Sequence, residues 1–100
     1  SYAPFSADLT APTSGQVINS GGAASVSVTF QWVGSDPDND IASYALYLDN
    51  TNGATQVVAS QTAATATQTL ASGKTYYWKV VTKDKLGNTS VSTVNSFRIN

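Results

Sequence analysis

The chain contains no cysteine, histidine, methionine or glutamate, and only 11 of its 100 residues are charged. Without thiolate or imidazole groups, the sequence excludes a zinc site of the usual kind, a cysteine nucleophile and a Ser-His-Asp triad. The absence of cysteine also excludes a disulfide framework, so cysteine usage does not indicate a redox compartment. We therefore expect a protein that is not an enzyme and needs no cofactor, with calcium left as the one metal to consider.

Positive charge and long apolar runs are also scarce. Five basic residues against six acidic ones give a net charge of −1, which argues against a basic face for binding nucleic acid. No apolar run approaches the roughly 20 residues of a membrane helix, so we expect no membrane insertion. The sequence begins without methionine or an apolar leader, and we interpret it as a segment of a longer polypeptide.

What the chain does have is serine and threonine, 13 of each, and an alternation of apolar and polar residues. A period of two is typical of half-buried β-strands. It is most regular at residues 26–32, where two valines, a phenylalanine and a tryptophan alternate with serine, threonine and glutamine. Similar segments predict strands at 44–48, 76–80 and 94–99, and weaker patterns predict strands at 7–11, 15–19, 56–60 and 64–70. No segment has the spacing of an amphipathic helix.

Turn-forming residues separate these segments. Residues 35–40 combine one proline with several Asx side chains, which favour a turn. The Asn52-Gly53 pair accepts a positive φ, and glycines indicate further turns at 72–74 and 85–88. Because one sheet cannot bury its apolar face alone, short strands without helices predict an all-β, seven-stranded antiparallel β-sandwich. We expect a linker at residues 1–6 and a single domain at residues 7–100.

Several phrases of the sequence together resemble a known family. A proline-containing opening strand (residues 9–12) precedes a strand that ends in Trp32, and the segment 70–76, Leu-Ala-Ser-Gly-Lys-Thr-Tyr, has Ser72 in place of the usual proline. Over residues 11–99 the chain resembles a fibronectin type III domain of the immunoglobulin-like class, in the bacterial form found in extracellular proteins of Bacteroidetes. A general immunoglobulin-like sandwich is the alternative. We expect the following residues in the structural core: Trp32, Tyr44, Leu46, Leu70, Tyr76, Trp78 and Val80.

The resemblance also implies roles for particular residues. Tyr76, at the entry to the sixth strand of the family, is placed for a tyrosine corner, in which its hydroxyl bonds backbone a few residues upstream. Trp32 matches the buried tryptophan of the family. The third and sixth strands are expected to be neighbours.

The densest acidic cluster is Asp36, Asp38 and Asp40, with Asn39 between the last two. Carboxylate and amide oxygens of this kind could hold Ca²⁺, but the segment lacks the glycine and distal glutamate of an EF-hand. The alternative is a solvated turn whose side chains bond local backbone. Neighbouring carboxylates on one loop do not build a hydrolytic cleft, and we expect Asp84 near the opposite end of the sandwich.

Tyr47 and Tyr77 are expected to point outward from neighbouring strands, on the face opposite Leu46 and Trp78. An exposed aromatic pair could bind a glycan or a protein, or it could be a cross-strand pair that stabilises the sheet surface. Lys79 and Lys83 are expected on the same outward face, where lysines keep a sheet soluble.

From these observations we expect an extracellular or cell-surface module of a larger protein. It would be a non-catalytic spacer, scaffold or protein-interaction domain whose partners are neighbouring domains of the same polypeptide. The alternative function is a carbohydrate-binding β-sandwich module of a glycan-utilisation protein.

Overall fold

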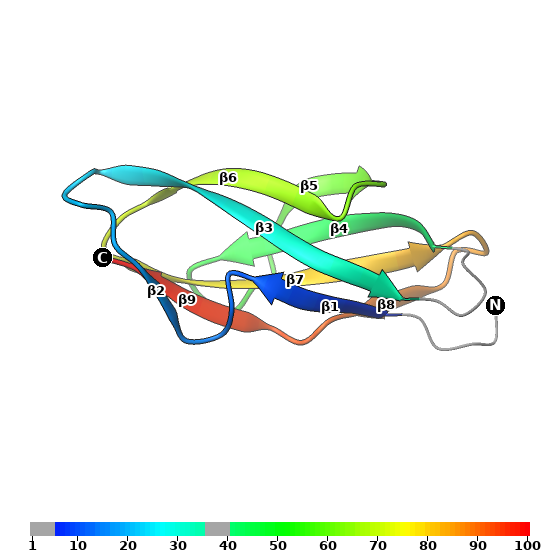
Figure 1. The fold of residues 1–100 in the computed structure, drawn as a ribbon. Coiled ribbons are helices and arrows are strands. Elements are labelled where there is room, and N and C mark those ends of the chain that lie inside the picture. Colours follow the sequence, from blue (N-terminus) through cyan, green and yellow to red (C-terminus); the bar gives the residue numbers. More distant parts are fainter. Residues whose placement is uncertain (1–5, 36–40) are drawn as a thin grey trace.

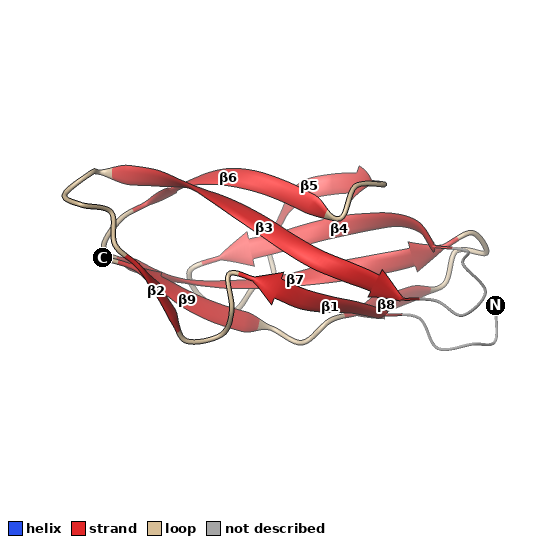
Figure 2. Ribbon diagram, viewed as in Figure 1, coloured by secondary structure: helices blue, strands red, loops and turns tan. Residues whose placement is uncertain are grey.

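All the regular secondary structure that the structure describes is β-strand (Figure 2). The computed structural model of the protein describes residues 6–35 and 41–100. Within these ranges, no helix is long and apolar enough to cross a membrane. Their strands are β1 (Ser6–Ala11), β2 (Gln16–Ile18), β3 (Ser25–Ser35), β4 (Ile41–Asp49), β5 (Gln56–Gln61), β6 (Thr65–Ala71), β7 (Lys74–Asp84), β8 (Thr89–Val91) and β9 (Asn95–Ile99).

The strands form two sheets that pack against each other (Figure 1). One sheet has the order β1-β3-β6, and the other has the order β2-β9-β7-β4-β5, with β8 pairing β7. The predicted all-β fold with two packed sheets is confirmed.

Two features of the sheets differ from the prediction. The described residues form nine strands rather than seven. Two of them have only three residues: β2, which lies within the weak pattern at 15–19, and β8, which is too short to produce a clear period-two signal. One pairing, β2 with β9, is parallel rather than antiparallel. β1 begins at Ser6, which pairs with Ser35.

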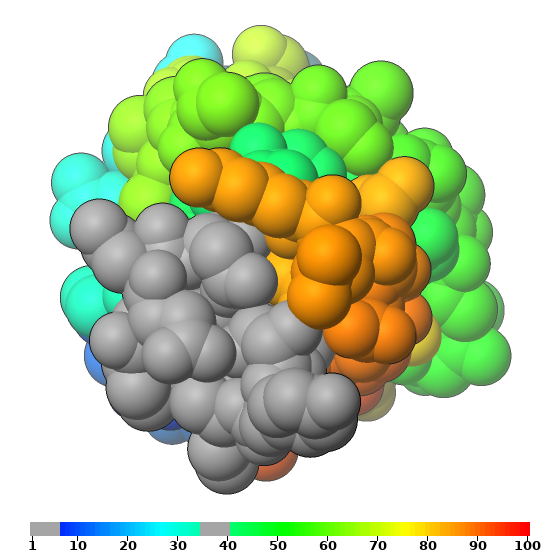
Figure 3. All heavy atoms as spheres, turned by 90° about the vertical axis from the view of Figure 1, so that its right-hand side faces the viewer, coloured from blue at the N-terminus to red at the C-terminus, as the bar shows by residue number. Residues whose placement is uncertain are grey.

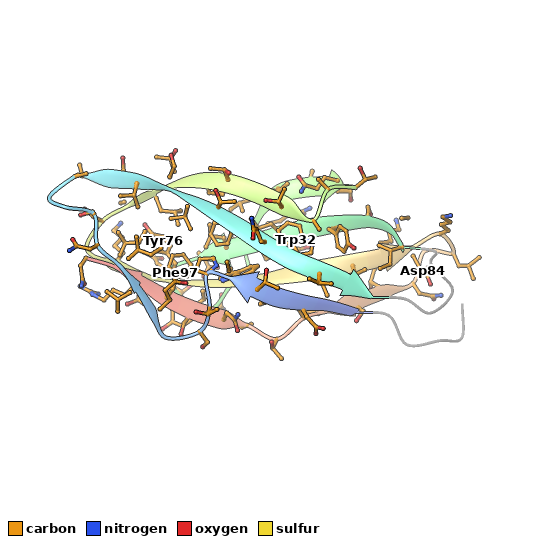
Figure 4. All side chains as sticks on the ribbon, in the orientation of Figure 1. Trp32, Tyr76, Asp84 and Phe97 are labelled. Carbon is orange, nitrogen blue, oxygen red and sulfur yellow. The ribbon has the colours of Figure 1, made fainter. Side chains whose placement is uncertain are left out.

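The core lies between the two sheets, and all seven residues expected there are buried. Phe30 and Phe97 join them, and the rings meet mainly edge to face, as in the 5.1 Å contact between the centroids of Phe30 and Trp78. Tyr76 stacks on Phe97 at 5.8 Å. In Figure 4, Trp32, Tyr76 and Phe97 lie between the layers. Aromatic pairs in these arrangements add to the apolar area that they bury.

The polar atoms of the core aromatic side chains differ in whether they find a hydrogen-bond partner. The Tyr76 hydroxyl donates to the carbonyl oxygen of Ala71 at 3.0 Å, which confirms the expected tyrosine corner. The Trp78 indole N–H donates to the carbonyl oxygen of Pro12 at 3.0 Å, between β1 and β2 where the chain crosses from one sheet to the other. The indole N–H of Trp32 is buried without a hydrogen-bond partner among the described residues. The two tryptophans are therefore both buried but differ in their hydrogen bonding.

Candidate functional site

The outward face of the larger sheet carries the candidate binding residues, on β4 and β7. These two strands are antiparallel neighbours, as expected for the third and sixth strands. Tyr47 lies directly opposite Lys79, and Tyr77 lies directly opposite Asp49. We call Tyr47, Tyr77 and Lys79 the tyrosine face. All three side chains are half-buried.

The register makes the two tyrosines diagonal neighbours rather than a directly opposed pair. Diagonal positions on one face of an antiparallel pair are roughly 7–8 Å apart, still within reach of aromatic side chains. The Lys79 ammonium nitrogen lies over the Tyr47 ring, 5.3 Å from its centroid. This cation–π contact contributes about 0.5–1 kcal/mol at exposed sites. Lys79 thus already covers one face of the Tyr47 ring. Lys83, which lies on β7 like Lys79, is exposed.

The loop after β4 is organised around the carboxylate of Asp49. Its Oδ1 atom accepts hydrogen bonds from the backbone N–H groups of residues 51–53 at 2.6–2.9 Å. Its Oδ2 atom accepts from those of residues 54 and 55 at 2.9 and 3.1 Å. The hydroxyls of Thr51 and Thr55 add contacts of 3.2 and 3.1 Å. The carboxylate therefore fixes the path of the whole loop.

The same hydrogen bonds stabilise the ionised form of this carboxyl group. The N–H of Gly53 is the largest cause, and with smaller contributions from Thr51, Asn52 and Ala54 it holds the pKa of Asp49 well below its usual range. Partial burial acts in the opposite direction and is outweighed. Asp49 is therefore an anion at neutral pH whose lone pairs are already engaged by the protein.

Gly53 joins this loop to the tyrosine face. It has a positive φ of 76°, as the Asn52-Gly53 pair predicts. A Cβ at this position would lie 3.5 Å from the backbone of Tyr77 and 3.5 Å from the side chain of Val94. The loop is thus packed beside the backbone of Tyr77.

A second carboxylate, that of Asp84, is buried at the end of β7. Its Oδ1 atom accepts from the N–H groups of Leu86 and Asn88 at 3.0 and 2.8 Å, and Oδ2 accepts from the Asn88 side chain at 3.2 Å. Burial acts to raise the pKa of Asp84, but the hydrogen bonds from Asn88 and Leu86 outweigh it, and the pKa is lowered. The carboxylate closes the turn between β7 and β8.

The position of Asp84 corrects the prediction that placed it at the far end from the acidic cluster. Asp84 pairs with Ile41, the first residue of β4, so it lies at the end of the sandwich where the chain passes from β3 to β4. The reason is that β4 and β7 run antiparallel, so the end of one lies beside the start of the other. Figure 4 labels Asp84 at this end, and Figure 3 views the same end, with the β7–β8 turn in orange.

Asp36, Asp38 and Asp40, the candidate calcium ligands, lie outside the described residues. Within residues 6–35 and 41–100, no group of three or more acidic side chains is placed to hold a metal ion. The carboxylates of Asp49 and Asp84 are occupied by backbone and side-chain donors of their own loops. Both serve the structure of a turn.

Sequence reasoning missed the role of Asp49. It recognised the Asn52-Gly53 turn but not that the aspartate three residues earlier accepts five backbone hydrogen bonds. The available signal was an Asx residue directly before a polar, glycine-containing segment at the end of a strand.

Comparison of the chain with protein-family models, with curated proteins and with solved structures found no match in any of the three.

Proposed function

We propose that this chain is a non-catalytic β-sandwich module that holds neighbouring parts of a larger secreted or cell-surface protein at a fixed separation. The observation that carries the proposal is the path of the chain through an elongated body of 47 × 21 × 19 Å. β1 starts at one end of this body, and the C-terminus lies at the other (Figure 1). A rigid unit crossed from end to end is suited to spacing and orienting what is attached to it.

The pairing of strands gives the separation. Asp8 on β1 is level with Val33 on β3. At the other end, the backbone N–H of Ser72 donates to the carbonyl oxygen of Ala24, and that of Gly73 donates to the carbonyl oxygen of Ile99. Because Ser72 and Gly73 are adjacent, the C-terminal residues lie at about the same height along the body as Ala24. From residue 24, which directly precedes β3, to residue 33 within it, at about 3.3 Å per residue, the axial distance is about 30 Å. Two packed sheets and a continuous aromatic core resist bending over this length.

We also propose that the module is of the fibronectin type III kind. Three features support this proposal: the buried Trp32, the corner made by Tyr76 and Ala71, and the adjacency of β4 and β7. The parallel pairing of β2 with β9 is a departure from a purely antiparallel sandwich. The low charge and the many serine and threonine residues support an extracellular location.

An end-to-end distance measurement tests the spacer function. Because the chain has no cysteine, cysteines introduced for Asp8 and Asn100, both exposed, give uniquely placed spin labels. Pulsed electron resonance then measures the distance between the labels. Singly labelled variants of each position control for association between copies. We expect a narrow distribution at about 30 Å or more, the value given by the strand rise.

A second candidate function, glycan or protein binding by the tyrosine face, is favoured by the shared outward orientation of Tyr47 and Tyr77. We expect any such ligand to be lost in the Tyr47→Ala/Tyr77→Ala double variant and retained in Val81→Ala, which alters the same face of β7 further along the strand. A glycan array with both variants measures this. If the wild-type chain binds no glycan, or if the double variant binds as well as the wild type, the glycan-binding role is rejected and the spacer proposal is unaffected.

A further inference from the structure

The edges of the two sheets are not equally protected against pairing with another strand. Exposed edge strands carry unpaired N–H and C=O groups, and proteins usually guard them with charges, prolines, bulges or short length. β1 carries Asp8 and a register shift between Leu9 and Ala11. β5 has two register shifts against β4, and β2 has only three residues.

β6 has none of these protections. Its seven residues, Thr-Ala-Thr-Gln-Thr-Leu-Ala, contain neither charge nor proline. All seven pair with β3 in one uninterrupted register. β6 is the outer strand of the β1-β3-β6 sheet, and no strand of the described ranges pairs with its other side. The surrounding sequence also lacks charge, since no charged residue occurs between Asp49 and Lys74.

The hydrogen bonds at both ends of the ladder identify which backbone groups of β6 face outward. The N–H of Trp32 donates to the carbonyl oxygen of Ala64, and the N–H of Ser72 donates to that of Ala24. Because ladder bonds in an antiparallel pair fall on alternate residues, the even-numbered residues of β6 bond β3. The odd-numbered residues 65, 67, 69 and 71 therefore point their N–H and C=O groups to the free edge.

The two ends of this edge are partly satisfied by side chains, whereas the centre is open. The Gln61 amide donates to the carbonyl oxygen of Thr65 at 2.7 Å, and the Tyr76 hydroxyl donates to that of Ala71. The open groups are thus centred on Thr67 and Thr69. Both threonine side chains are exposed on the outer face of the sheet.

We propose that this edge is a self-association site, at which β6 of one copy pairs antiparallel with β6 of a second copy. A two-fold axis through Gln68 places Thr67 opposite Thr69 of the second copy, and the two residues exchange both of their backbone hydrogen bonds. The result is one continuous sheet across two molecules, an isologous pairing of the kind found in two-fold dimers.

The side chains of β6 are complementary to themselves in this register. On the outer face, Thr67 and Thr69 each meet a threonine, a pairing that the chain already makes between Thr29 and Thr67, whose hydroxyl oxygens are 3.2 Å apart. Thr65 meets Ala71, which is also uncharged. On the inner side, the Gln68 side chain lies opposite Gln68 of the second copy, and Ala66 lies opposite Leu70 of the second copy. No like charges are brought together, which favours a second copy of this chain over a charged partner.

The test removes one outward-facing donor without touching the internal ladder. Thr67→Pro deletes an N–H that points away from β3, a position where an edge strand accepts proline. Thr67→Val keeps this N–H and the β-branched shape and is the matched control. Sedimentation velocity over roughly 10 µM to 1 mM, the range of weak Kd values, measures association. Near-ultraviolet circular dichroism of the buried tryptophans verifies that each variant is folded.

We expect the wild type and Thr67→Val to dimerise with increasing concentration, and Thr67→Pro to associate roughly tenfold more weakly or not at all, since each bond occurs twice in a two-fold pair. If Thr67→Pro does not fold, Thr69→Lys replaces it, with the same expectation from charge at the edge. Amide hydrogen exchange gives a second readout: the N–H groups of Thr67 and Thr69 should become protected only at high concentration. A wild type that stays monomeric to 1 mM, or a folded Thr67→Pro that dimerises like the wild type, would overturn the proposal.

Discussion

Replacing Trp78 with alanine is expected to lower the free energy of unfolding by about 3–5 kcal/mol, the range for truncating a large buried aromatic side chain. Trp78 is fully buried and contacts the rings of both Phe30 and Trp32. Its indole N–H also donates a hydrogen bond to the carbonyl oxygen of Pro12, where the chain crosses between the sheets. Because a typical domain is stable by only about 5–15 kcal/mol, the variant should lose a large share of its stability. Urea denaturation followed by tryptophan fluorescence measures the loss.

The two tryptophans provide a matched comparison. Trp78→Phe removes the indole N–H that donates to Pro12 and leaves the Pro12 carbonyl oxygen without this hydrogen bond. We expect the free energy of unfolding to fall by about 1–3 kcal/mol. Trp32→Phe removes an N–H that has no partner within residues 6–35 and 41–100, so its cost should be the smaller of the two. Equal losses in the two phenylalanine variants would contradict the assignment of the Trp78–Pro12 bond as a structural contact.

Replacing Asp49 with alanine is expected to lower the free energy of unfolding by about 1–3 kcal/mol at neutral pH, because the backbone donors of residues 51–55 lose their charged acceptor. The lower part of this range applies, since the loop is largely exposed and water replaces some of the lost bonds. Asp8→Ala, an equal change of charge at an exposed position of β1, should change stability much less.

The effect of Asp49 should depend on pH with a defined sign. Its pKa is lower in the folded chain than in the unfolded chain, so its contribution is fully present above the unfolded value of about 3.9 and is lost as pH falls below it. The stability difference between the wild type and Asp49→Ala should therefore shrink between pH 5 and pH 2. Asp84 contributes with the same sign and remains in both chains. A difference that stays constant over this interval would contradict the role of the ionised carboxylate.

The strands and core of this protein were largely predictable, for a physical reason that individual residues illustrate. Trp32, Leu46 and Trp78 are buried because successive side chains of a strand alternate between faces, so one large apolar residue fixes the orientation of its neighbours. Phe97 and Ile99 are buried by the same alternation. The pattern fails for β8, whose three residues carry no complete alternation.

The outward face and the loops were less predictable because they depend on register and on local hydrogen bonds. Alternation places Tyr47 and Tyr77 on one face but does not say that Lys79, rather than Tyr77, lies opposite Tyr47. The role of Asp49 depends on the conformation of the six residues after it, and the position of Asp84 depends on the direction of β7 relative to β4. The register and the position of Asp84 come from pairing between distant segments, and the role of Asp49 comes from the conformation of its own loop. The alternation of apolar and polar residues encodes neither.

The distance between spin labels at positions 8 and 100 tests the central claim most directly, because a spacer must hold its two ends apart. The strand pairing predicts one narrow distribution at about 30 Å or more, unchanged when the sample is diluted. A broad distribution, or one centred below about 20 Å, less than seven residues of extended strand, would contradict the proposal that this sandwich is a rigid unit crossed from end to end.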